Sequence, residues 1–73
     1  MQNEIKLDEE YLDQLLTETE ASEVLSFSVY ALRNWRVRGG GPKFVKVSQR
    51  SVRYRRRDLN SWAIKLLKNN TSE

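Results

Sequence analysis

The chain has 73 residues, enough for one domain with a small core. It contains no Cys and no His, which excludes a disulfide, thiolate or imidazole metal ligands, and the most common general base. The formal net charge is +3, and it is unevenly distributed. No long apolar run and no signal-peptide pattern is present, so we expect a cytoplasmic protein. The lack of His, Cys, paired carboxylates in the basic region and a phosphate-binding loop predicts a non-enzymatic protein without cofactor or metal.

The N-terminal part is acidic. Met1 to Glu23 contains eight acidic residues and one basic residue. We expect residues 1–14 to form an acidic tail or a short helix, because apolar residues there recur at helical spacing. An extended segment that buries Leu15 and Leu16 fits the same pattern. An acidic N-terminal segment is usually a solvated face or tail. Its functional alternatives are competition with a polyanion for a basic surface and docking of a partner.

A capping box predicts the start of the next helix. Thr17 and Glu20 are spaced so that each side chain can bond the backbone N–H of the other residue. We expect this helix from about Glu18 to Leu25. Its inward face is expected to consist of Ala21, Val24 and Leu25.

Ser28 is a good N-cap for a second helix, from Val29 to about Val37. Phe27 precedes the cap and is expected in the core. The inner side of the helix is expected to be formed by Val29, Leu32, and Trp35 or the stem of Arg36. Two short helices joined by a three-residue turn, with basic and amide side chains outward, have the dimensions of a helix-turn-helix.

The segment after this helix changes to a strand pattern. Gly39 to Pro42 ends the helix, since Gly permits the left-handed C-terminal conformation and Pro prevents resumption. Residues 43–47 and 52–55 alternate with period two and predict a two-stranded hairpin with Gln49 and Arg50 at its tip. A last helix is expected from about Asp58, followed by a polar tail over residues 69–73. Its apolar residues at helical spacing are Leu59, Trp62, Ala63, Leu66 and Leu67. The aromatic residues expected in the core are Trp35, Phe44, Tyr54 and Trp62.

Basic residues dominate the middle of the chain. Ser28 to Arg57 holds ten Lys or Arg among thirty residues and no acidic residue, with apolar and aromatic residues interleaved. A disordered basic tail does not need this spacing. The pattern is typical of a small folded surface that presents positive charge to a polyanion such as nucleic acid.

The segment from Leu15 to Leu67 resembles the excisionase-type winged helix-turn-helix domains, which belong with the MerR-like DNA-binding domains and include phage excisionases and AlpA-type regulators. The resemblance rests on the capped helix, the Arg33-x-Trp35 pair, the Gly41-Pro42 turn and the run from Val52 to Trp62. It implies an α+β, mostly helical fold over residues 15–68. The expected order is two short helices, a two-stranded β-hairpin wing and a closing helix. Two departures are Ser26, where the family turn usually carries Gly, and a triple glycine richer than usual.

The resemblance implies that the second helix enters the major groove and that the wing reaches the adjacent minor groove or phosphates. It places Val29, Tyr30, Arg33 and Asn34 toward the groove and Arg50 at the wing tip. Arg suits guanine and Asn suits adenine, whereas the structural alternative is a solvated helix face. Ser28 caps the helix and also suits a phosphate. The remaining expected DNA-binding residues, of which one or two could instead pair with the acidic helix, are Arg36, Arg38, Lys46, Gln49, Arg53 and Arg55.

These features predict a sequence-specific double-stranded DNA-binding protein, either an excisionase-like recombination directionality factor or a small transcriptional regulator of a mobile element. Its partners would be DNA, a site-specific recombinase and further copies of itself on adjacent sites. A phage terminase small-subunit-like packaging protein is an alternative. An RNA or single-strand binder would expose Phe44 or Tyr54 for stacking. A protein-interaction module of antitoxin or inhibitor type would expose an apolar patch.

Overall fold

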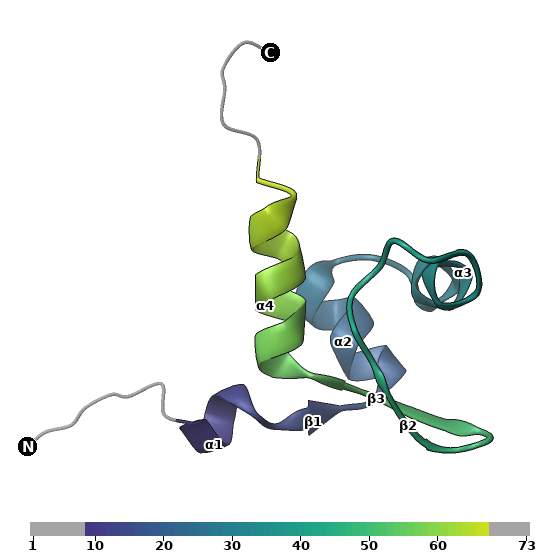
Figure 1. Ribbon diagram of the computed structural model, residues 1–73, viewed down its shortest axis with the longest axis horizontal. Coiled ribbons are helices and arrows are strands. Elements are labelled where there is room, and N and C mark those ends of the chain that lie inside the picture. Colours follow the sequence, from purple (N-terminus) through teal and green to yellow (C-terminus); the bar gives the residue numbers. More distant parts are fainter. Residues whose placement is uncertain (1–8, 68–73) are drawn as a thin grey trace, which may run out of the picture.

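The computed structural model describes residues 9–67, so the first eight residues of the expected acidic tail and the expected polar tail over residues 69–73 lie outside the described part (Figure 1). The elements in chain order are α1 (Glu9–Leu12), β1 (Leu15–Leu16), α2 (Glu18–Leu25), α3 (Val29–Arg38), β2 (Val45–Ser48), β3 (Ser51–Arg55) and α4 (Arg56–Lys65). Figure 1 shows α3 and the β2–β3 hairpin on one side of the molecule and α4 on the other. The fold is the predicted α+β winged helix-turn-helix.

The two helices of the helix-turn-helix begin at their predicted caps. The backbone N–H of Glu20 donates to Thr17 Oγ1 at 3.1 Å, and the N–H of Thr17 donates to Glu20 Oε1 at 2.9 Å, which completes the capping box of α2. Ser28 Oγ accepts from the Ala31 N–H at 3.0 Å and caps α3. Between the helices, Ser26 adopts φ 60°, so a serine takes the left-handed conformation for which the turn usually uses glycine.

The sheet has one strand more than the sequence analysis predicted. The order is β1-β3-β2, with both neighbouring pairs antiparallel. The two-residue strand β1 pairs with β3, and Leu16 lies opposite Tyr54. The region before α2 therefore divides into a one-turn helix and a strand, and the extended interpretation applies only to its second half. Leu16 is buried and Leu15 is half-exposed, because successive strand residues point to opposite faces.

The core is small and draws on most elements. Its buried apolar residues are Leu16, Ala21, Leu32, Tyr54 and Leu59, with Leu25, Trp35 and Val52 packed against them. The buried Ser22 hydroxyl donates to the Thr19 carbonyl at 2.7 Å, so this polar group is satisfied inside the helix. One or two residues each from β1, α2, α3, β3 and α4 thus hold together a domain with little apolar surface to bury.

Several expected core residues lie at the surface. Phe27 is 47 % exposed and packs edge-on against Trp35, with the ring centroids 5.2 Å apart. Phe44 is 40 % exposed, whereas Tyr54 is completely buried. Val24 is also exposed, and Ser22 takes its place on the inner side of α2. The end of α4 extends away from the other elements (Figure 1). The exposed apolar residues at the end of α4 and directly after it are Ala63, Ile64, Leu66 and Leu67.

The glycine turn after α3 is fitted against an aromatic cluster of Phe27, Trp35 and Trp62. The centroids of the two indole rings are 4.9 Å apart, and Trp62 Nε1 donates to the Gly40 carbonyl at 2.9 Å. A Cβ on Gly41 would lie 2.4 Å from Trp35 Cβ, so only glycine fits there. The cluster thereby fixes where the chain leaves α3 and enters the hairpin.

Candidate nucleic-acid interface

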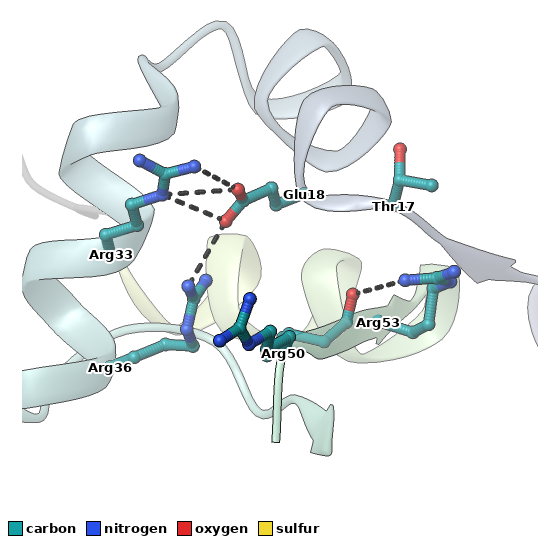
Figure 2. A pocket seen from close by; sticks show the side chains of 7 residues that line it. Thr17, Glu18, Arg33, Arg36, Arg50 and Arg53 are labelled. Atoms are coloured by element: carbon teal, nitrogen blue, oxygen red, sulfur yellow. Dashed lines mark hydrogen bonds and ion pairs between the residues drawn. The ribbon is translucent and has the colours of Figure 1, made fainter. Parts of the chain in front are cut away.

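A cavity of about 380 Å³ opens between α3, the start of α2 and the β2–β3 hairpin (Figure 2). Figure 2 shows Arg33 and Arg36 of α3 directed toward Glu18, and Arg50 and Arg53 on the hairpin, where the Arg53 side chain points away from Glu18. The lining residues are Thr17, Glu18, Arg33, Arg36, Arg50, Val52 and Arg53. Four guanidinium groups against one carboxylate give the cavity a strongly positive lining.

Glu18 is bound by two arginines of α3. Arg33 Nη2 donates to Glu18 Oε2 at 2.6 Å and Arg33 Nε donates to the same oxygen at 3.2 Å. Arg36 Nη2 donates to Glu18 Oε1 at 3.2 Å. The Arg33 side chain is nevertheless 54 % exposed, so it belongs both to this ion pair and to the surface. The expected alternative, in which one or two basic residues pair with the acidic helix, occurs here for Arg36, and Arg33 binds the same carboxylate.

Arg36 is more enclosed than Arg33. Its side chain is 18 % exposed, and its Nη1 donates to the hydroxyl of Tyr54 at 2.6 Å. Its Cζ lies 5.9 Å from the centroid of the Phe44 ring and 6.0 Å from that of Tyr54. Cation–π contacts at this distance add to the hydrogen bonds. Arg36 therefore links α3, α2 and the hairpin, a position that local sequence patterns do not indicate.

The ion pairs shift the protonation of both partners. The hydrogen bond from Arg33 lowers the pKa of Glu18 below its ordinary value; partial burial opposes this shift and Arg36 reinforces it. The hydrogen bond to Glu18 raises the pKa of Arg33. Both groups are thus charged near neutral pH. Two arginines and one carboxylate leave the α3 side of the cavity with net positive charge.

The outer face of α3 is exposed along its length. Tyr30 is 77 % exposed, and Arg33 and Asn34 follow it at the i+3 and i+4 positions of the same face. Val37, at i+7, is 85 % exposed and was not among the candidate residues. Ser28 is exposed at the helix cap, whereas Val29 is half-buried at the edge of this face. The apolar side chain of Val37 gives no sequence signal for an exposed position. Val37 is exposed because of the way in which α3 packs.

The hairpin carries its candidates at the tip and on both faces. Gln49 and Arg50 occupy the turn between β2 and β3 and are exposed. Lys46 pairs with Val52 and so shares the hairpin face that lines the cavity. Arg53 folds back, with its Nη1 donating to the Val52 carbonyl at 3.0 Å. Arg38 is exposed in the last turn of α3.

Arg55 forms ion pairs with acidic residues and does not line the cavity. Its Nη2 donates to Asp58 Oδ1 at 3.0 Å, and its Nη1 lies 3.6 Å from Asp13 Oδ1. The hydrogen bond to Asp58 raises the pKa of Arg55. Arg57 likewise pairs with Asp13 at 2.7 Å and with Glu9. The acidic residues of the α1 region therefore contact the start of α4, and none of them lines the cavity.

Comparison with known proteins places the fold in a family. A family model described as a helix-turn-helix domain matches residues 15–65, the range from β1 to the end of α4. The search of curated proteins gave no match. Among the described residues, no helix has the length and apolar character needed to cross a membrane. The matched range includes both helices and the hairpin that form the cavity, and a helix-turn-helix domain implies DNA as a partner. The chain belongs to the helix-turn-helix domain family.

Proposed function

We propose that the protein binds double-stranded DNA in a sequence-specific manner, with α3 in the major groove and the β2–β3 wing on the adjacent minor groove or phosphates. The observation that carries the proposal is the cavity between α3 and the wing, which has two arginines on each side. A phosphate backbone that passes between these elements would meet guanidinium groups from both sides. Charge-assisted bonds of this kind fix the register of a protein on the duplex.

The exposed face of α3 supplies the side chains that contact the base edges. Arg33 and Asn34 have the hydrogen-bonding groups for guanine and adenine, and each bidentate contact contributes about 1–3 kcal/mol of discrimination. Tyr30 and Val37 are exposed on the same face, and Val29 borders it. Tyr30 suits a thymine methyl group or a phosphate, and Val37 suits a thymine methyl group. The residues assigned to phosphates or to the minor groove are Ser28, Arg38, Lys46, Gln49, Arg50 and Arg53. Arg36 and Arg55 act mainly through the ion pairs that hold the elements together.

The test is selection of bound sequences from random double-stranded DNA at two salt concentrations, followed by sequencing. We expect a short motif whose binding weakens as salt rises, because phosphate contacts release counterions. Arg33→Ala should remove the preference at one base pair, and Arg50→Ala should weaken binding to all sequences. Lys65→Ala, on α4, is the matched control that removes a positive charge outside the cavity. Absence of any selected motif at both salt concentrations would reject sequence-specific binding.

For the biological role, we infer an excisionase-like recombination factor or a small transcriptional regulator. One recognition helix and one wing read few base pairs, so several copies on adjacent sites would supply the affinity that one domain lacks. Footprinting, together with gel mobility of fragments that carry the site at the centre or the end, separates the two roles. Several adjacent footprints with a strong bend favour the excisionase-like role. A single site without a bend favours the regulator.

A further inference from the structure

We propose that Glu18 is a positioning residue for Arg33: it occupies one edge of the Arg33 guanidinium and thereby presents the other edge to a guanine. This inference rests on the proposed DNA binding and deepens it by assigning the base preference to a pair of residues. Glu18 lies on α2, at the first helical position after the Thr17 cap, and Arg33 lies on the exposed face of α3.

The geometry of the pair supports this division of edges. A guanidinium offers two edges for parallel hydrogen bonds, one formed by Nε with Nη2 and the other by Nη1 with Nη2. Glu18 accepts from Nε at 3.2 Å and from Nη2 at 2.6 Å, so the first edge is occupied. Nη1 of Arg33 has no partner among the described residues, and Figure 2 shows it directed away from Glu18. The free edge matches O6 and N7 of guanine in the major groove.

Glu18 is itself held in place from the core. Its other carboxylate oxygen, Oε1, accepts from Arg36 at 3.2 Å, and Arg36 donates to the hydroxyl of the fully buried Tyr54 at 2.6 Å. A chain of hydrogen bonds thus runs from the centre of the domain to the exposed Arg33. A long surface side chain fixed in this way loses less conformational entropy when it binds, which favours the correct base over others.

The same carboxylate has an opposite effect on general affinity. A negative charge beside the phosphates repels DNA of every sequence, so Glu18 weakens non-specific binding while it sharpens the choice at one base pair. These two effects have opposite signs in the Glu18→Gln variant. A residue that acts only on folding would change binding to all sequences in one direction.

The experiment measures binding to three duplexes: the selected sequence, the same sequence changed at the base pair that depends on Arg33, and a random sequence. In Glu18→Gln and Glu18→Ala we expect the ratio of the first two affinities to fall about three- to tenfold, part of the range for one bidentate contact. Affinity for the random duplex should rise. Glu23→Gln is the matched control, because Glu23 is an exposed acid on the same helix without an ion pair among the described residues. It should keep the ratio of the wild-type protein.

A double variant tests whether Glu18 acts on base preference through Arg33. In an Arg33→Ala background, Glu18→Gln should leave the ratio unchanged, since the side chain that it positions is absent. Unchanged discrimination with higher affinity for all duplexes would show that Glu18 is only a competing charge. An equal loss at base pairs that do not depend on Arg33 would show a general loosening of the domain, and circular dichroism checks the fold of each variant. Either result overturns the proposal. If the wild-type protein selects no motif, the proposed function itself fails.

Discussion

The hydroxyl of Tyr54 accepts a hydrogen bond of 2.6 Å from Arg36 Nη1, so a completely buried ring of the wing is joined to the helix that we place in the major groove. The Phe44 ring lies beside both residues and partly covers them. This contact joins α3 to the hairpin, in addition to the aromatic cluster at the glycine turn. The two elements that we propose to face DNA are thereby linked at the edge of the core.

Removal of the Tyr54 hydroxyl should loosen this link. We expect Tyr54→Phe to lower the free energy of unfolding by about 1–2 kcal/mol, because a hydrogen bond to a charged group is lost in a partly buried place. Chemical denaturation measures the change. Tyr30→Phe is the matched control, since the Tyr30 side chain is mostly exposed, and its stability should remain that of the wild type. Equal stabilities of all three proteins would contradict the structural role of the hydroxyl.

The Glu18 ion pairs predict a dependence of stability on pH. The pKa of Glu18 is lowered in the folded protein, chiefly by the hydrogen bond from Arg33. The stabilisation is therefore fully present above the ordinary pKa of a glutamate and is lost as the pH falls through the lowered value. Denaturation midpoints measured from pH 7 to pH 3 should fall more steeply in the wild-type protein than in Glu18→Gln. The control Glu23→Gln should follow the wild-type profile, and a parallel profile for Glu18→Gln would contradict the assignment.

Arg50 at the wing tip predicts a change in salt dependence. If its guanidinium neutralises one phosphate, Arg50→Ala should make the slope of log K against log salt less steep by about 0.9. Fluorescence anisotropy with a labelled duplex at four salt concentrations gives the slope. Lys65→Ala removes the same charge from α4 and should keep the slope of the wild-type protein. An unchanged slope in Arg50→Ala would place the wing tip away from the DNA.

Gly41 predicts a steric effect on the aromatic cluster. An added Cβ would lie 2.4 Å from Trp35 Cβ, and the helix backbone prevents Trp35 from moving freely. We expect Gly41→Ala to destabilise the domain by about 1–3 kcal/mol and to change the tryptophan emission of the folded protein. Gly39→Ala is the comparison: its φ of 92° disfavours alanine, but its Cβ meets no atom within 4 Å. It should lose stability without a change in emission, and identical spectra for both variants would reject the clash.

Short-range signals in the chain were sufficient to predict the local elements. The predicted helix from Glu18 to Leu25 is confirmed with the same bounds, because the Thr17–Glu20 box joins residues only three positions apart. The cap at Ser28 and the hairpin turn around Gln49 and Arg50 also occur as predicted. Their signals lie in backbone capping and in the period of apolar residues, which act within one or two turns of chain.

The surroundings of the site depend on contacts between residues that are far apart in the chain. The third strand has two residues, too few for a periodic signal, and it exists because β3 offers an edge for pairing. The contacts of Glu18 with Arg33 and Arg36 join residues 15 and 18 positions apart, and those of Arg57 with Asp13 and Glu9 join residues 44 and 48 positions apart. An arginine in the sequence has the same side chain whether it faces solvent or a carboxylate. Packing of the helices and the sheet determines whether an arginine faces solvent or a carboxylate, because packing sets which charges come within bonding distance.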